Sequence, residues 1–417
     1  MNSIQTEAKN FNVDKIKEKL DPKYGIFQDL NVFVFIGFGY LYTYLKYHSL
    51  SSVAISFAVG IFTLQFSILT NAFFHCCFDK KFSKIPLSLD YMVDGDFAAA
   101  TFLISYGAVM GKATFFQLFF MSFMECIFYS LNYKLGFEKL QVDDFGGSCY
   151  VHSFGALFGI GVSWLLYYDK KSKLEANPCK RSTKMTNTFA FIGTIFLWIF
   201  WPSFNTARIE NDNEDKRYRA IINTILSITG SCIGTFITCY IFHGGKVEPE
   251  DMLRASIAGG VYVGGSSVMM NMPFASLIVG LFGGVISTLG FECLGPYCGK
   301  TCKLFETSGV LYLHGIPGFL GAVISAICVA CMKSSKWKAG DIDNREKILH
   351  KNRSAAKQAG YEILVELITI ALSLAGGIIT GLILRLPACG DNKNYYMDDE
   401  YWKEENEDEE SKVMVPT

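Results

Sequence analysis

Two similar stretches decide the fold: Val151-His152-Ser153-Phe154-Gly155 and Leu313-His314-Gly315-Ile316-Pro317-Gly318. Each places a histidine inside a long apolar run, followed by small or helix-bending residues. An ionisable side chain in a segment of membrane length is costly to bury, so its default interpretation is functional. The two histidines are 162 residues apart (314 − 152) in similar surroundings, which is the pattern that a duplicated half would leave. A pair of imidazoles within a bilayer could hold a metal, relay protons or line a pore.

The composition indicates a membrane protein with several spans. The 417 residues are 50% hydrophobic and 15% aromatic, and only 18% are charged; a soluble chain of this length would form two or three domains with more charge. The formal net charge of −1 gives no indication of nucleic-acid binding. Most of the 13 cysteines, Cys239 among them, stand singly in apolar runs as small hydrophobes. Cys298 and Cys302 share a loop but lack a second pair, so we expect no metal and no cofactor.

Eleven segments are apolar and close to the roughly 20 residues that a bilayer requires of a helix. An odd number of spans would put the two termini on opposite sides of the membrane. Glycine pairs recur in these segments, and small residues allow helices to approach closely in lipid. The predicted spans are 30–44, 53–74, 97–110, 115–131, 148–168, 189–204, 220–242, 255–270, 275–294, 309–332 and 363–386.

We expect three parts along the chain. Residues 1–26 form a polar N-terminal tail with no cleavable signal peptide, and residues 27–387 form the transmembrane domain. Residues 388–417 form an acidic C-terminal tail, in which the run from Asp398 to Glu410 is expected to be solvated.

The charge distribution leaves the orientation open. Loops 170–184 and 333–357 are both basic but would lie on opposite sides, and the basic N-terminus favours an inside position for that end. The sequon Asn352-Arg353-Ser354 favours the reverse, because its glycosylation would place loop 333–357 outside.

Longer motifs resemble a known family. Asp144-Phe145-Gly146-Gly147-Ser148-Cys149-Tyr150-Val151-His152 resembles the entrance to the fifth span of ammonium transporters (Amt/Rh). Leu197-Trp198-Ile199-Phe200-Trp201-Pro202-Ser203-Phe204-Asn205 is similar to the end of the sixth span in their Rhesus (Rh) glycoprotein branch, and residues 97–112 resemble its third span. The similarity extends from residue 27 to about residue 402, so the chain is identified as a member of that branch.

The resemblance implies an all-α polytopic fold with eleven transmembrane helices. Two inverted five-helix repeats would surround a pore, as in many transport folds, and one further helix would embrace them. It also implies a homotrimer with one pore per subunit, an outside N-terminus and an inside C-terminus. The implied substrate is ammonium or ammonia, in a lipid bilayer and without enzymatic activity. The plasma membrane is the expected location, with a vacuolar membrane as the alternative.

The same resemblance assigns roles to six residues. His152 and His314 correspond to twin histidines that line the pore, against the plainer interpretation of two buried structural histidines. Phe97 and Phe204 correspond to stacked phenylalanines that gate the outer vestibule, where aromatic faces attract cations.

Asp144 and Glu306 stand at the starts of the histidine-bearing spans. A carboxylate there can accept orphan backbone N–H groups or favour a cation electrostatically. The family usually has Asp where this chain has Glu306, which adds a methylene at the lower half of the pore.

Three other functions compete with ammonium conduction. The chain could be a CO2 or dual gas channel, or a non-conducting ammonium sensor. It could also be a membrane enzyme with His152 and His314 as metal ligands, although two histidines without further ligands make a poor metal site.

Overall fold

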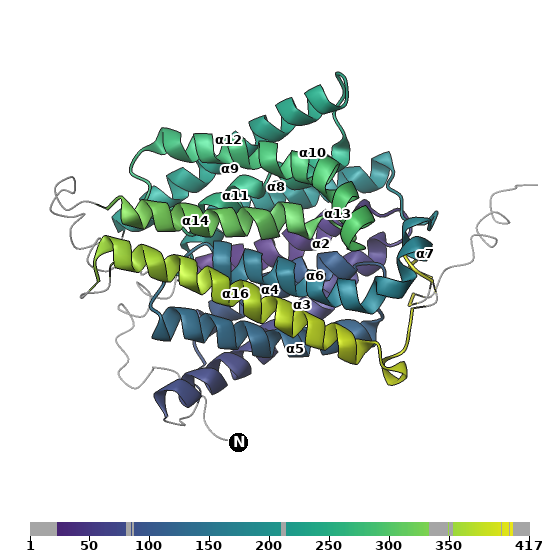
Figure 1. Cartoon of the computed structure of the whole chain (residues 1–417), viewed down its shortest axis with the longest axis horizontal. Coiled ribbons are helices and arrows are strands. Elements are labelled where there is room, and N and C mark those ends of the chain that lie inside the picture. The colour runs from purple at the N-terminus through teal and green to yellow at the C-terminus, as the bar shows by residue number, and fades with distance from the viewer. Residues whose placement is uncertain are drawn as a thin grey trace, which may run out of the picture.

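The computed structural model describes residues 23–80, 85, 87–209, 214–332, 349, 353–392, 394–399, 401 and 402. These residues form a bundle of packed helices (Figure 1) and, apart from an isolated bridge between Leu45 and Ser182, no β structure. The predicted all-α polytopic fold is confirmed. The sequon at Asn352 lies outside the described residues, and most of loop 333–357 does too.

Most crossings of the bundle are made by single long helices. The first runs from Lys23 to Tyr44 and includes a π-helical stretch, η1 (Val32–Phe38). The others are α3 (Ser49–Asp79), α4 (Leu89–Val109), α5 (Phe115–Lys134), α6 (Phe154–Tyr167), α8 (Lys184–Thr206), α9 (Glu214–Phe242), α12 (Pro273–Leu289), α14 (Ile316–Ala330) and α16 (Ala355–Leu384).

Nine helices in the described part of the chain are long and apolar enough to cross a membrane. Helix α4 is not among them, because Asp90, Asp94 and Asp96 lie in its first two turns. It has little need of an apolar surface, since every residue from Gly95 to Val109 is buried inside the bundle. With α4 and one broken crossing, the described chain traverses the bundle eleven times, in agreement with the predicted count.

The broken crossing differs from the prediction of one helix over 255–270. It consists of α10 (Pro249–Ala255) and α11 (Ala258–Val263), followed by turns. The Ser148 side chain donates to the Val261 carbonyl (2.7 Å) and accepts from the Gly265 N–H (2.8 Å), so tertiary hydrogen bonds replace helical ones. Irregular backbone is tolerated at membrane depth where it is buried in protein.

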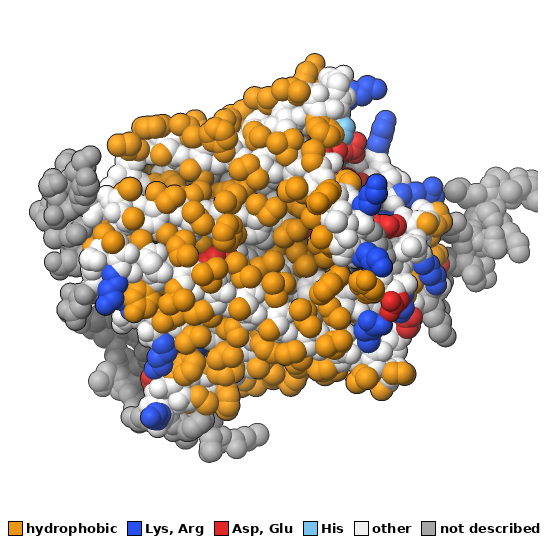
Figure 2. Space-filling model, viewed as in Figure 1, with side chains coloured by type: hydrophobic (Ala, Val, Ile, Leu, Met, Phe, Trp, Pro, Cys, Tyr) orange, Lys and Arg blue, Asp and Glu red, His pale blue; other side chains and the backbone are white. Residues whose placement is uncertain are grey.

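The outer surface suits a bilayer. Hydrophobic side chains cover the middle of the face shown in Figure 2, whereas charged side chains gather mainly towards its right-hand end. Large exposed apolar side chains of this surface include Phe236, Ile241, Phe282 and Leu367. The chain is therefore a multi-pass membrane protein.

The first helix begins at one end of the bundle and the C-terminal segment packs at the other, as an odd number of crossings requires. Lys23 pairs with Asp90 at the start of α4 (2.7 Å). At the other end, the N–H of Tyr396 donates to the Gly111 carbonyl just beyond α4 (2.7 Å). We call these the gate end and the tail end.

The C-terminal segment was predicted to be solvated from Asp398 onwards. Its described residues up to Trp402 instead pack against the start of α3. Asp398 accepts hydrogen bonds from the N–H groups of Leu50 and Ser51 (3.1 and 2.8 Å), so it caps the first turn of α3. Trp402 donates to the Ser51 hydroxyl (2.8 Å). The amides at the start of α3 need an acceptor that His48, the residue before the helix, does not provide. Asp398 supplies it.

His48 makes this packed segment sensitive to pH. Its side chain is 3% exposed, and burial lowers the pKa of the imidazole to about 4, although Asp398 lies 3.9 Å away and opposes the shift. The unfolded imidazole has a pKa near 6.5, so the neutral buried ring stabilises the fold fully above that pH. This stability is lost as the pH falls from about 6.5 towards 4.

We expect acidification from pH 7.5 to pH 5 to destabilise the protein by about 2 kcal/mol through His48 alone. His48→Gln, which cannot be protonated, should show a smaller loss over the same interval. Thermal melting of both proteins in detergent at the two pH values measures the difference. An identical pH dependence in wild type and His48→Gln would contradict this role.

Candidate conduction pathway

The two predicted histidines meet at the centre of the bundle. His152 and His314 are 0% and 1% exposed. Their Nδ1 atoms are 3.1 Å apart, and their rings lie parallel within 4° with centroids separated by 5.1 Å. Neither Nε2 atom has a hydrogen-bond partner. This contact is a hydrogen bond if one Nδ1 carries a proton and the other does not. The two Nε2 atoms then remain available to a small polar guest.

Quasi-equivalent backbone turns present the two rings. His152 lies in the π-helical stretch η4 (Ser148–Ser153), and His314 lies in η7 (Leu311–Gly315). Five residues before each histidine stands a glycine with positive φ, Gly147 at 71° and Gly309 at 73°. This backbone conformation strains residues that carry a Cβ. The repeat inferred from the sequence is therefore visible as a repeated turn, carried by the fifth and tenth crossings in opposite directions.

The two predicted carboxylates cap these turns. Asp144 accepts hydrogen bonds from the N–H groups of three residues, Ser148, Cys149 and Tyr150, at 2.8–2.9 Å. Glu306 accepts from two, those of Val310 and Leu311. Burial raises the pKa of both carboxyl groups, and these hydrogen bonds oppose the shift. Both contacts are the capping interactions that a carboxylate at a helix start can make.

Stacked aromatic rings lie between the gate end and the histidines. Phe97 and Phe204 stack with centroids 4.4 Å apart, as the resemblance implied. Phe33 also stacks on Phe204 (4.6 Å), and Trp201 stacks on the His152 ring (5.7 Å). Phe97 and Phe204 were predicted as the gate, whereas Phe33 and Trp201 were not singled out as site residues. All four side chains are 0% exposed. These buried rings therefore fill the interior of the bundle next to the histidine pair.

Arg208 is a functional candidate that the sequence did not reveal. Its guanidinium lies 3.8 Å from the centroid of the Phe97 ring and donates to Asp94 (3.1 Å). One face of Phe97 therefore already carries a cation, so the expected attraction of ammonium to that ring competes with a resident positive charge. Arg208 follows the Trp-Pro-Ser-Phe-Asn motif by three residues, and no spacing rule would have placed it over the ring.

Two further acidic residues of this region are buried without complete hydrogen bonding. Asp96, beside Phe97, is 0% exposed, and neither of its carboxyl oxygens has a hydrogen-bond partner. Glu125 accepts from the Ser105 hydroxyl (2.6 Å) through one oxygen only.

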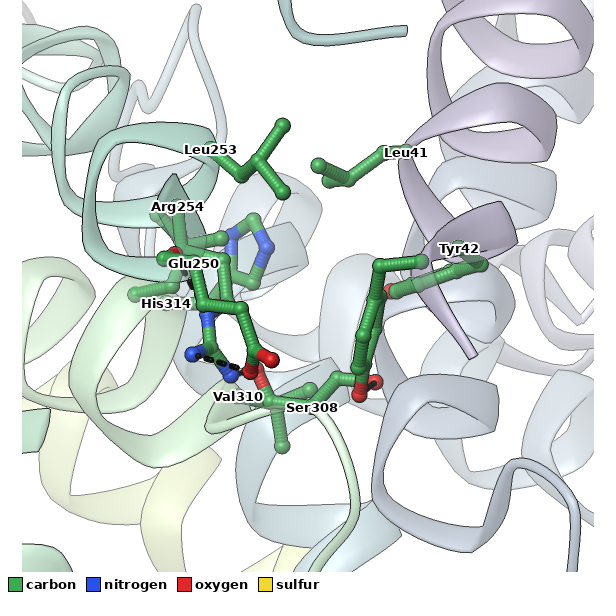
Figure 3. A pocket seen from close by; sticks show the side chains of 10 residues that line it. Leu41, Tyr42, Glu250, Leu253, Arg254, Ser308, Val310 and His314 are labelled. Carbon is green, nitrogen blue, oxygen red and sulfur yellow. Dashed lines mark hydrogen bonds and ion pairs between the residues drawn. The ribbon is translucent and has the colours of Figure 1, made fainter. Parts of the chain in front are cut away.

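A narrow pocket continues from His314 towards the tail end (Figure 3). Its volume is about 10 Å³, which is the space of one water molecule. The lining is mainly apolar, and its tail-end side carries the ion pair of Arg254 and Glu250 (3.2 Å). Its lining residues are Leu41, Tyr42, Tyr44, Glu250, Leu253, Arg254, Ser308, Val310, Leu313 and His314.

Glu250 and Arg254 also border a wider, open cavity of about 450 Å³, which we call the vestibule. Its polar lining is mostly acidic, with Glu306 among the lining residues. The vestibule and the narrow pocket that His314 lines therefore adjoin at the Glu250–Arg254 pair. The acidic lining residues are Glu175, Glu248, Glu250, Asp251, Glu292 and Glu306, and the basic ones are Lys180 and Arg254.

Because Glu306 both caps η7 and faces the vestibule, substitution can separate the two roles. We expect Glu306→Asp to preserve flux and Glu306→Gln to lower stability by about 1 kcal/mol or less with flux retained, since the amide oxygen still caps the turn. Liposome flux and thermal melting measured on the same preparations check this. A large loss of flux in an equally stable Glu306→Gln variant would instead show that the charge acts on the permeating cation.

The comparisons with known proteins agree with this geometry. Residues 12–405 match the model of the Ammonium Transporter Family. The chain is 37% identical to Ammonium transporter Rh type B of Xenopus tropicalis over 400 residues, covering 95% of this chain and 85% of that protein. It is 34% identical to Ammonium transporter Rh type C of Oncorhynchus mykiss, covering 99% and 84%.

The fold also matches a solved structure of the same branch. Rh50 of Nitrosomonas europaea, a member of the Rhesus family of channels, aligns with a TM-score of 0.79 at 29% identity, over 95% of this chain and 96% of that one. Mep2 of Saccharomyces cerevisiae aligns with a TM-score of 0.67 at 16% identity and shares the fold. The chain belongs to the ammonium transporter family, in its Rh branch.

Proposed function

We propose that this protein is a transmembrane channel for ammonia and ammonium. The path runs from Phe97 and Phe204 past His152 and His314 to the vestibule. The observation that carries the proposal is the parallel histidine pair, whose two unpartnered Nε2 atoms lie in a buried, mainly apolar passage. Such atoms can accept from, or donate to, a small nitrogen-containing guest.

The dimensions and lining of the passage explain selectivity. An ion that leaves water for an apolar lining loses several kcal/mol or more, whereas a small neutral molecule loses far less. A pocket with space for about one water molecule cannot hold a hydrated Na⁺ or K⁺. Ammonium can release its proton to solvent or to a histidine and cross as NH3. In this mechanism the Nε2 atoms of His152 and His314 are the polar atoms that the guest contacts between the aromatic stack and the narrow pocket.

Family membership also supports proposals for the assembly and the location of the protein. We propose a homotrimer with one pathway per subunit, in the plasma membrane, with the N-terminus outside. The opposite positions of Lys23 and Tyr396 along the bundle support termini on opposite sides. CO2 is a second candidate cargo, supported only by the apolar lining of the narrow pocket.

Flux into liposomes tests the function. Vesicles containing the purified protein and a pH-sensitive dye are exposed to an ammonium gradient, with protein-free vesicles as the control. Entry of NH3 raises the internal pH because the molecule takes up a proton, whereas entry of NH4⁺ carries a current. We expect fast alkalinisation without current and no K⁺ flux. Ammonium binding without flux would favour the sensor, and CO2 entry above the control would establish the dual channel.

A further inference from the structure

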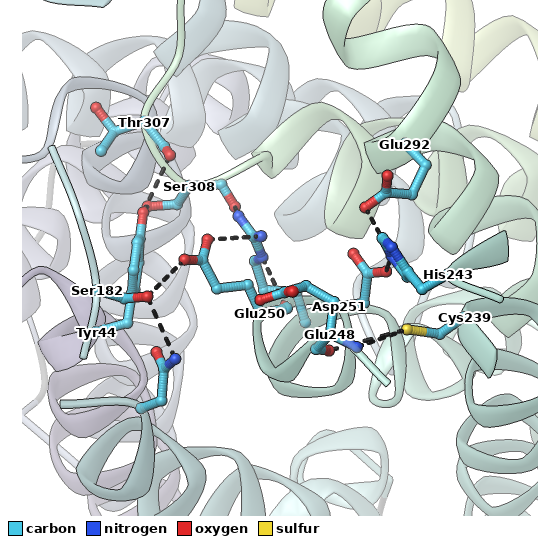
Figure 4. A network of polar contacts seen from close by, with 12 residues as sticks. Tyr44, Ser182, Cys239, His243, Glu248, Glu250, Asp251, Glu292, Thr307 and Ser308 are labelled. Atoms are coloured by element: carbon cyan, nitrogen blue, oxygen red, sulfur yellow. Dashed lines mark hydrogen bonds and ion pairs between the residues drawn. The ribbon is translucent and has the colours of Figure 1, made fainter. Parts of the chain in front are cut away.

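A cluster of metal-binding side chains borders the vestibule away from the histidine pair. Cys239 and His243 come from the end of α9, Asp251 from α10, and Glu292 from η6 (Gly290–Leu294), which follows α12. Figure 4 shows Asp251 and Glu292 on either side of His243, with Cys239 close by. Three separate crossings of the bundle therefore contribute side chains of the types that bind transition metals.

The distances within the cluster are those of side chains that share one small partner. His243 Nε2 lies 3.5 Å from Asp251 Oδ2 and 3.4 Å from Glu292 Oε1. Potential ligand atoms of Cys239, His243 and Asp251 all lie within 4.8 Å of one another. Tetrahedral ligands of zinc are about 3.3–3.8 Å apart, given bonds of 2.0–2.3 Å. The two histidine contacts already have that separation, and a side-chain movement of about 1 Å would bring in the thiol.

The backbone holds Cys239 and His243 in register. The His243 N–H donates to the Cys239 carbonyl (2.9 Å), so the helical turn continues through His243. Residues four apart on a helix lie on the same face. The sulfur of Cys239 also accepts the N–H of Glu248 (3.1 Å). Backbone donors of this kind commonly support metal-bound ligands from outside the coordination sphere.

Two atoms of the cluster lack the partners that burial requires. Asp251 is 1% exposed, and its Oδ2 atom makes no hydrogen bond. His243 Nε2, which faces it, makes none either. Among the described residues, the basic side chain that pairs with Asp251 and Glu292 is His243, which is charged only when protonated. While His243 is neutral, no cation lies beside the buried Asp251 carboxylate. Such burial is costly, and a metal ion would satisfy both atoms at once.

A second cluster of similar composition provides a contrast. His75, Asp79 and Glu138 also converge, but Lys134 lies 3.0 Å from Glu138 and Lys139 lies 3.6 Å from Asp79. The side chains of His75 and Asp79 are 45% and 51% exposed. Solvent and lysines already neutralise these carboxylates, so this cluster is a surface ion-pair network and serves as a control.

We propose that Cys239, His243 and Asp251, with Glu292 as the fourth ligand, bind a divalent transition metal ion, for which Zn²⁺ is the best match. One sulfur, one imidazole nitrogen and two carboxylate oxygens suit its borderline softness and tetrahedral preference. Asp251 and Glu292 line the vestibule, which gives the ion an entry path. Binding releases the thiol proton and ties the ends of α9, α10 and η6 together beside the conduction pathway.

Metal binding to the purified full-length protein tests this site without any transport measurement. The protein is stripped with a chelator, then titrated calorimetrically with ZnCl2, and separately with CoCl2 while absorbance is recorded. We expect one Zn²⁺ per chain and a thiolate-to-cobalt charge-transfer band. Cys239→Ser should abolish the band, and His243→Gln or Asp251→Asn should weaken Zn²⁺ binding about tenfold or more.

Matched controls come from the same chain. Cys232→Ser, two turns earlier on α9, and His75→Gln, in the surface ion-pair network, should leave both signals unchanged. A band that persists in Cys239→Ser, or the absence of stoichiometric Zn²⁺, would overturn the proposal. If Cys239→Ser does not assemble, X-ray absorption of Zn²⁺ bound to the wild type decides: one sulfur neighbour supports the site, and a shell of nitrogen and oxygen alone rejects it.

Discussion

Replacing His152 and His314 together by alanine is expected to reduce ammonium-dependent flux about tenfold or more while the protein remains folded. The pair supplies two ring nitrogens that have no hydrogen-bond partner in the protein, whereas the Tyr42 and Tyr44 hydroxyls of the pocket lining already donate to backbone carbonyls. Removing a buried hydrogen-bond partner costs a polar guest about 1–3 kcal/mol, and each 1.4 kcal/mol corresponds to a tenfold change in rate. Apolar methyl groups offer no replacement.

Alkalinisation of liposomes under an ammonium gradient measures this loss, and size-exclusion chromatography confirms the assembly. Each single variant should also lose flux, because the Nδ1–Nδ1 hydrogen bond needs both rings and one Nε2 atom is removed. His75→Gln, at the surface, is the matched control and should conduct like the wild type. Wild-type flux through a folded double variant would show that the pair is structural, which was the plainer interpretation of the two residues.

The repeated turns explain why so much of this fold could be predicted. Asp144 and Glu306 each precede a histidine by eight residues, and Gly147 and Gly309 each precede one by five. A glycine with positive φ and a carboxylate that caps the turn depend only on neighbouring residues. Both can therefore be recognised within one short stretch of sequence. The number of crossings could also be predicted, because the length and hydropathy of a segment depend on that segment alone.

The missed features all depend on partners distant in sequence. The broken eighth crossing depends on Ser148, which bonds to backbone more than a hundred residues away. Arg208, two residues beyond the end of α8, lies over Phe97 of α4 through the tertiary fold, which no sequence periodicity encodes. Cys239 was interpreted as a small hydrophobe because its likeness to a metal ligand appears only when Asp251 and Glu292 are folded beside it.

Asp144 should have the largest effect on stability. It is 7% exposed and satisfies three consecutive amides of the buried turn that carries His152. Asp144→Ala leaves all three donors without an acceptor, and unsatisfied buried groups cost about 1–3 kcal/mol each. We therefore expect a loss of about 3 kcal/mol or more, seen as a large fall in the melting temperature of the detergent-solubilised protein.

Two further substitutions separate capping from charge. Asp144→Asn keeps one acceptor oxygen and should lose less stability than Asp144→Ala. Asp90→Ala removes an exposed carboxylate, also in the first turn of a helix, whose surface ion pair with Lys23 should contribute about 1 kcal/mol or less. If Asp144→Ala melted like Asp90→Ala but lost flux, the carboxylate would act on the permeating cation. If Asp144→Ala instead lowered both the flux and the melting temperature, Asp144 would act by holding the turn that positions the His152 ring against His314.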